Sequence, residues 1–157
     1  MRQTITFKEI LQEEEIKTYI RRADLSLERM GFTEHSFAHV MRVSKCAGDM
    51  LQQLGYDEHD VESARIAGYM HDIGNVINRI DHAQSGAIMA FRILDKMGMQ
   101  YEDIAKIIAA IGNHDESTAF PVSDVEAALI IADKSDVRRS RVRNADKSSF
   151  DIHDRVN

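Results

Sequence analysis

Apolar residues recur every three or four positions along most of the chain, which is the spacing of one face of an α-helix. The first such stretch runs from Phe7 to Met30 and is otherwise rich in Glu, Lys and Arg. Gly31 follows it, and glycine is favoured just after a helix C-terminus. The pattern predicts one or two helices over residues 7–30, with inward positions at Ile16, Ile20, Leu25 and Leu27.

Two more helices are predicted before residue 73. One covers 36–54 and is closed by Gly55, with an inward face formed by His39, Val43, Ala47, Met50 and Leu54. The next covers 58–72, with Gly74 supplying the turn and an inward face formed by Val61, Ala64, Ala67 and His71. His71 and Asp72 are therefore expected at a helix end.

After a predicted loop over 74–81, apolar residues at helical spacing continue through the second half of the chain. Asp81 is the expected N-cap of a helix whose inward face holds His82, Gly86, Met89, Ile93 and Met97. A short helix follows, with Ile104, Ile107, Ile108 and Ile111 inward and His114 just past its last turn. Pro121 and a capping box of Ser123 and Glu126 then begin a helix whose inward positions are Val125, Leu129, Ala132, Asp133 and Asp136. The polar tail after Asn144 receives no assignment.

Composition supports an all-α fold, since the chain has one proline, no tryptophan and many good helix formers. Its 157 residues, without repeat or linker, predict a single domain over 1–157. A net charge of −6 argues against binding a DNA or RNA duplex. No apolar run is long enough to cross a membrane, the first residues lack a secretion signal, and Cys46 is a lone cysteine, so we expect a cytoplasmic protein. The sequence leaves open whether the chain forms a homodimer.

Six chemically active residues interrupt the apolar faces or follow their ends. They are His39, His71, Asp72, His82, His114 and Asp133. Burying charges costs several kcal/mol unless they are paired or hold a metal, and one shared metal centre would compensate all six. Mixed imidazole and carboxylate ligands suit a divalent transition metal (Mn, Fe, Co, Ni or Zn) better than magnesium.

A single histidine on an apolar face is more often a core residue bonded to a carbonyl group, and only the set as a whole favours a metal. His59 and His153 lie among charged residues, so both are predicted to be surface histidines. His35, one helical turn before His39, has two open interpretations. It is either a further ligand or phosphate contact, or a capping or surface residue.

The sequence also resembles a known family. The segment "HVMRV" from His39, the pair His71 and Asp72, and Asp133 within "IIADKSD" resemble the H…HD…D signature of HD-domain metal-dependent phosphohydrolases. The resemblance covers about 34–136, with 7–30 as an N-terminal helical extension, and it implies an all-α HD-domain bundle. It assigns one metal to His39, His71, Asp72 and Asp133. It implies a second metal, bridged by Asp72, at His82 and His114.

Two branches of that family fit less well. Members of the HD-GYP branch, which cleave cyclic dinucleotides, have a lysine and a histidine pair where this chain has Asn75 and Asn113–His114. Related single-metal nucleotidases use a carboxylate shortly after the HD pair, whereas the next acidic residue here is Asp81. Both activities are therefore disfavoured.

The predicted reaction is hydrolysis of a phosphate ester of a small metabolite, such as a nucleotide, by water activated at one or two metal ions. Asp72 would bridge the ions, and the proton for the leaving group would come from His82, His114, Asp115 or water. The candidate phosphate-binding cations are Arg79, Lys134, Arg138 and Arg139, although each could equally be a solvated surface charge. Two alternatives are a catalytically silent module that binds metal or nucleotide, and a di-iron oxygenase.

Overall fold

The computed structural model describes residues 1–157 except 147, 149–153 and 156–157. Its elements are α1 (Phe7–Ile10), α2 (Glu14–Arg29), α3 (Phe37–Gln53), α4 (Glu58–Met70), η1 (Ile73–Val76), α5 (His82–Lys96), α6 (Tyr101–Gly112), α7 (Asp124–Ser135) and η2 (Arg139–Arg141). Within the described residues the β-pairing consists of one isolated bridge between Gln3 and Met99. The all-α prediction is therefore confirmed.

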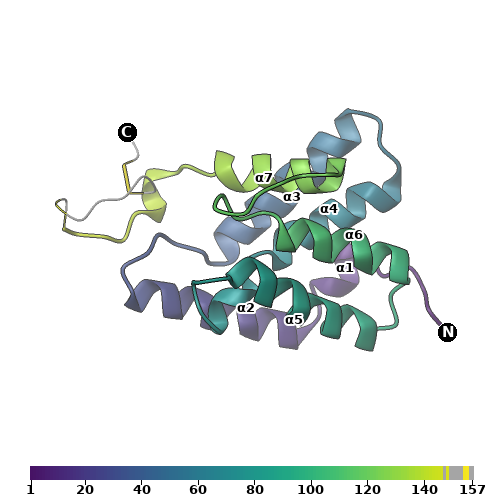
Figure 1. Cartoon of the computed structure of the whole chain (residues 1–157), viewed down its shortest axis with the longest axis horizontal. Coiled ribbons are helices and arrows are strands. Elements are labelled where there is room, and N and C mark those ends of the chain that lie inside the picture. The colour runs from purple at the N-terminus through teal and green to yellow at the C-terminus, as the bar shows by residue number, and fades with distance from the viewer. Residues whose placement is uncertain (147, 149–153, 156–157) are drawn as a thin grey trace.

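The helices enclose one continuous cluster of buried apolar residues. Helix α3 packs against α4 and α7, α5 packs against α6, and the short η1 turn packs against both α2 and α5. In Figure 1 the long helices α2 and α5 form the lower part of the molecule, α3 and α7 lie above them, and α6 runs between these groups. The helix ends that carry the candidate site residues come from α3, α4, α5, α6 and α7.

Two glycines allow the close contacts that bring these ends together. A Cβ on Gly68 of α4 would lie 2.7 Å from the main-chain Cα of Ser44 in α3. A Cβ on Gly74 of η1 would lie 1.9 Å from the carbonyl oxygen of His82. Both distances are too short for a side chain, so glycine is required where α4 meets α3 and where η1 meets α5.

Most predicted helices are confirmed, with corrections at their ends. The stretch 7–30 forms two helices, α1 and α2, and Ser123 caps α7 by accepting a hydrogen bond from the Glu126 N–H, as predicted. Leu54 is 73% exposed, so its inward assignment was wrong. Asp81 occupies the N-cap position of α5 in a left-handed conformation (φ 56°), but its side chain makes no capping hydrogen bond.

The connection between α4 and α5 also differs from the prediction. Helix α4 ends at Met70, two residues earlier than predicted, and residues 73–76 form a 3₁₀ turn within the predicted loop. His59 is exposed, as predicted, whereas His153 lies outside the described residues. In the part of the chain that the structure describes, no helix is both long and apolar enough to span a bilayer.

Candidate metal centre

The first donor cluster consists of His39, His71, Asp133 and one carboxylate oxygen of Asp72. His39 lies on the first turn of α3, His71 follows α4, and Asp133 lies on the last turn of α7. His39 Nε2 is 3.2 Å from Asp133 Oδ1 and 3.6 Å from Asp72 Oδ2. His71 Nε2 is 3.0 Å from the same Asp72 oxygen and 3.5 Å from the same Asp133 oxygen. Four donor atoms from three helix ends thus surround one point.

The second donor cluster consists of His82, His114 and the other oxygen of Asp72. His82 is the first residue of α5, and His114 follows the C-terminus of α6. Their Nε2 atoms are 3.6 and 3.8 Å from Asp72 Oδ1 and 3.2 Å from each other. Each oxygen of one carboxylate therefore faces a different pair of histidines.

Each of the four histidines uses its Nδ1 atom in a hydrogen bond to an oxygen. His39 Nδ1 is 2.8 Å from Asp136 Oδ2, and the other three lie 2.6–3.0 Å from the carbonyl oxygens of Gly68, Arg79 and Ile111. A carbonyl or ionised carboxylate oxygen only accepts hydrogen bonds, so Nδ1 must carry the proton. In the neutral rings the Nε2 lone pairs consequently point into the two donor clusters, as in metal-binding histidines.

These donor atoms fit a bound cation. His39 Nε2, His71 Nε2 and Asp72 Oδ2 are buried and have no hydrogen-bond partner among the described atoms. The Nε2 atoms of His82 and His114 face each other at 3.2 Å although both carry lone pairs. Unpaired buried polar atoms are rare, and a metal ion or a proton would satisfy both sets. Among the residues that the structure describes, three ligand groupings have metal-like spacing: His39–His71–Asp72, His71–His114–Asp133 and Asp72–His82–His114.

The charges of the centre respond to burial and to one another. Burial lowers the pKa of His71, but the carboxylates of Asp72 and Asp133 outweigh this effect and raise it to about 10. Burial raises the pKa of Asp72, yet its histidine neighbours hold it well below its usual range. Burial raises the pKa of Asp133 as well, yet the neighbouring imidazoles of His39 and His71 hold it well below its usual range. Without a metal, a proton on His71 takes the place of the cation.

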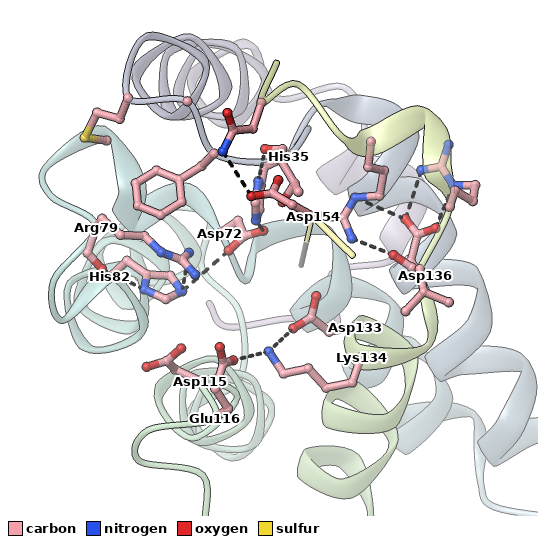
Figure 2. A pocket seen from close by; sticks show the side chains of 18 of the residues that line it. His35, Asp72, Arg79, His82, Asp115, Glu116, Asp133, Lys134, Asp136 and Asp154 are labelled. Atoms are coloured by element: carbon pink, nitrogen blue, oxygen red, sulfur yellow. Dashed lines mark hydrogen bonds and ion pairs between the residues drawn. The ribbon is translucent and has the colours of Figure 1, made fainter. Parts of the chain in front are cut away.

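The donor clusters lie at one side of a cavity of about 880 Å³. Asp72, Asp133, His82 and His114 line it, whereas the fully buried His39 and His71 do not. The other lining residues include four cations, two acidic residues of the loop after α6, and an apolar wall: Arg79, Lys134, Arg138, Arg141, Asp115, Glu116, Met30, Phe32 and Val137. Figure 2 shows Arg79 and His82 on one side of Asp72, and Asp133 with Lys134 across the cavity.

His35 lies at the same cavity, with its side chain 11% exposed. Its Nδ1 is 2.6 Å from the carbonyl oxygen of Thr33, and its Nε2 is 4.0 Å from Asp72 Oδ2. Burial lowers the pKa of His35 to about 4, so the ring is neutral at pH 7. The capping alternative is excluded, because Ser36 is the N-cap of α3.

Comparison with known protein families adds to this geometry. The model of the HD domain matches residues 36–148. The chain belongs to the HD domain family. HD-domain proteins form a superfamily of metal-dependent hydrolases. The all-α bundle of this chain agrees with the fold that the resemblance implied.

Relatives of this HD domain include an uncharacterized protein of Methanocaldococcus jannaschii, 25% identical over 94% of this chain and 65% of the relative. Ribonuclease Y of Latilactobacillus sakei is 30% identical over 66% of this chain but only 17% of its own length. The crystal structure of a predicted HD superfamily hydrolase from an uncultured Thermotogales bacterium matches with a TM-score of 0.60 and 26% identity, covering 83% of this chain and 73% of the other. The HD domain thus spans less than two thirds of either sequence relative.

The structure brings all six candidate metal ligands of the HD domain together and places His35, Arg79, Asp115, Lys134 and Arg138 at the cavity. It does not bring Arg139 there. Arg139 is exposed on η2, and Arg141, two residues later, lines the cavity instead. Asp136 and Phe32 were not predicted as site residues. The position of Asp136 on the inward face, three residues after Asp133, was the one available signal for it.

Proposed function

We propose that this HD domain hydrolyses a phosphate ester of a small metabolite, with two divalent transition metal ions bound at the donor clusters. The proposal rests on the position of the Asp72 carboxylate. Its two oxygens face separate histidine pairs at the side of a cavity large enough for a small organic ligand. When bound, a metal pair lowers the pKa of water and neutralises charge on the phosphate.

The residues of the chain divide the remaining tasks. His39, His71 and Asp133 would hold one ion, His82 and His114 the other, and Asp72 both. Arg79 is the cation best placed to bind the phosphate, because its Nη1 lies beside the second donor cluster, 3.5 Å from His82 Nε2. Its other polar contact, to Asn75 Oδ1, is 3.4 Å long, so the guanidinium loses little by turning to an anion.

The other cavity cations already have strong partners. Lys134 is 2.8 Å from Asp133 Oδ2 and also contacts Glu116, and Arg138 is held by Asp136. These residues would set the field of the site, while Arg79 contacts the substrate directly. Asp115 lines the cavity next to His114 and would donate the proton to the leaving group. Neutral His35 presents its Nε2 lone pair toward Asp72 and would accept a hydrogen bond from the attacking water.

The apolar wall supports a substrate with a flat ring, such as a nucleotide. Phe32 lines the cavity, and the Arg79 guanidinium lies 5.5 Å from the centre of its ring. A phosphate at Arg79 would therefore place the rest of the substrate near this aromatic side chain, which can stack on a nucleobase. Phe32→Ala should raise KM for nucleotides without changing hydrolysis of glycerol phosphate, and Phe32→Tyr should restore the nucleotide KM. Equal effects on both substrates would exclude the stacking role.

A second candidate substrate is RNA, since relatives over 66% of the chain are named ribonuclease Y. Ribonuclease action is also phosphate ester hydrolysis and would use the same centre. The net charge of −6 disfavours extended contact with a nucleic-acid backbone, so a short single strand would be the form bound.

The test is a substrate panel with protein loaded with Mn²⁺ and, separately, with Fe²⁺. The panel contains nucleoside mono-, di- and triphosphates, glycerol phosphate and a short single-stranded oligoribonucleotide, and phosphate or fragment release is measured. Turnover of at least one ester, lost on chelation and in Asp72→Asn, supports the proposal. Binding without turnover would favour the silent module. Substrate-dependent oxygen consumption without phosphate release would favour the oxygenase.

A further inference from the structure

We propose that Asp136 is a positioning residue that orients His39 toward the metal and connects this ligand to the arginines of the cavity wall. The inference rests on the metal centre of the proposed function. Asp136 is the C-cap residue of α7, three positions after Asp133. The same helix end would therefore supply both a metal ligand and the group that orients a second ligand.

The contact to His39 is short and enclosed. Asp136 Oδ2 is 2.8 Å from His39 Nδ1, and the two side chains are 6% and 0% exposed. The bond fixes the proton on Nδ1 and holds the ring so that Nε2 faces Asp133 and Asp72. His39 contributes nothing else to the cavity, because its ring is fully buried.

The partner of His39 differs in kind from the partners of the other three histidines. His71, His82 and His114 donate to main-chain carbonyl groups, each three residues earlier in the chain. His39 donates to a carboxylate 97 residues away. A hydrogen bond to a charged acceptor is about twice as strong as one between neutral groups, and it makes the opposite ring nitrogen a stronger electron donor. Asp136 would therefore strengthen metal binding at the first donor cluster in particular.

The charge of Asp136 is balanced by arginines. Arg138 donates from Nε to Oδ1 at 2.6 Å and from Nη2 to Oδ2 at 2.9 Å, which is a two-point contact. Arg141 donates from Nη1 to the Asp136 carbonyl oxygen at 2.6 Å. Both arginines line the cavity, so one residue joins the buried ligand His39 to the cationic wall. Figure 2 shows Asp136 with dashed lines that mark its hydrogen bonds to neighbouring side chains. In this view Asp136 and Glu116 lie on opposite sides of Asp133.

A purely structural role would make Asp136 an anchor for the segment after α7 and nothing more. The two roles predict different metal binding. Asp136→Asn keeps the shape and an acceptor for His39 but removes the charge, whereas Asp136→Ala removes both. Glu34→Gln is the matched control, because Glu34 is a second carboxylate next to Arg138, 3.6 Å away, and its side chain is not bonded to the His39 ring.

The experiment titrates Mn²⁺ into metal-free protein and follows binding by calorimetry. We expect affinity at the tighter site to fall roughly tenfold in Asp136→Asn and roughly a hundredfold in Asp136→Ala, the range found when outer partners of metal ligands are removed. Glu34→Gln should stay within about twofold of wild type. In Zn²⁺-loaded protein, NMR of the His39 ring should show a protonated, slowly exchanging Nδ1 that exchanges fast in Asp136→Ala.

Unchanged Mn²⁺ affinity in a folded Asp136→Asn protein, checked by circular dichroism, would overturn the inference even if Asp136→Ala fails to fold. Equal losses in Asp136→Asn and Glu34→Gln would also overturn it, because they would indicate a general effect of the wall. If wild-type protein binds none of the transition metals, the metal centre itself fails and the positioning role with it. Binding by wild type with unchanged variants would instead refute the positioning role alone.

Discussion

The two donor clusters share Asp72 but are built differently. The first donor cluster has four protein donors, and its histidines are fully buried and absent from the cavity wall. The second has three donors, and both of its histidines line the cavity. Closed metal sites serve structure, whereas catalytic sites keep positions open for water and substrate. We therefore expect the first cluster to anchor a metal and the second cluster to be the place where substrate meets the centre.

Their surroundings strengthen this difference. Ligands of the first cluster are supported by charged side chains, Asp136 on His39 and Lys134 on Asp133. Histidines of the second cluster are supported by carbonyl groups of their own local turns, and their neighbours Arg79 and Asp115 belong to the cavity. Substitutions in the first cluster should therefore change metal retention most, and those in the second should change turnover most.

Asp72 belongs to both clusters, so its loss should have the largest effect. Asp72→Ala should lower metal content at both clusters and reduce phosphate ester hydrolysis by at least ~10³-fold, which corresponds to several kcal/mol of transition-state stabilisation. Metal analysis and steady-state kinetics measure both. Asp81→Asn, a nearby exposed change that tolerates the left-handed backbone, should leave both near wild type. An Asp72→Ala enzyme with wild-type turnover would place the chemistry elsewhere.

Asp115 tests the second cluster as the reactive side. Asp115→Ala should retain both metals and lose about 10²- to 10⁴-fold in rate, the usual contribution of a proton donor. Its hydroxyl partner gives a control: Ser117→Ala removes the hydrogen bond to Asp115 without removing the acid, and should cost far less. Metal loss in Asp115→Ala, or a rate equal to that of the Ser117 variant, would contradict the role.

Substituting the histidines tests directly whether the first cluster anchors a metal. His71→Ala should remove the first ion and weaken the second, because both depend on Asp72, which His71 contacts at 3.0 Å. His82→Ala should remove only the second ion and leave about one metal per chain. Elemental analysis after desalting gives the count. Equal metal content in His82→Ala and wild type would reduce the centre to one metal and leave His82 as a substrate or core residue.

Metal removal should lower stability. Free metal at one hundred times its dissociation constant stabilises the folded state by about 2.7 kcal/mol, because the ligands are assembled only in that state. For a chain of this size that corresponds to a melting temperature roughly 5–10 °C higher. The same shift in His82→Ala but not in His71→Ala would assign it to the first cluster. A melting curve that chelator leaves unchanged would count against both clusters.

The smallest predicted effect is the release of a proton when metal binds. In metal-free protein the pKa of His71 is about 10, above its value of about 6.5 in an unfolded chain. The stability from this protonation is present below pH 6.5 and is lost as pH rises through 10. Metal binding at pH 8 should therefore release a proton from His71. Calorimetry in buffers of different ionisation enthalpy measures this release, which should be absent in His71→Ala. No release by wild type would show that His71 is already neutral.

The sequence was sufficient to predict the six candidate ligands, because a polar residue on an apolar helix face can be recognised from spacing alone. His71 and Asp72 at the end of α4 and His114 after α6 followed from the same periodicity. Predicting these positions requires only the periodicity of one helix and no knowledge of how that helix packs against its neighbours.

Contacts made beyond the helix ends could not be predicted in this way. Helix α7 stops at Ser135, and the following 3₁₀ turn rotates the side chains, so the cavity receives Arg141 rather than Arg139. The hydrogen bond between His39 and Asp136 joins residues 97 apart and depends on how α3 and α7 pack. The 3₁₀ turn at Ile73–Val76 likewise depends on the approach of Gly74 to the start of α5.

The most direct test of a metal pair joined by Asp72 is anomalous diffraction from crystals of the Mn²⁺-loaded protein, measured on both sides of the manganese absorption edge. Two peaks are expected, one beside each oxygen of Asp72, and the peak at His39 and His71 should persist in crystals of His82→Ala. A single peak in the wild-type protein, or two peaks away from Asp72, would contradict the claim that this carboxylate joins two metal sites.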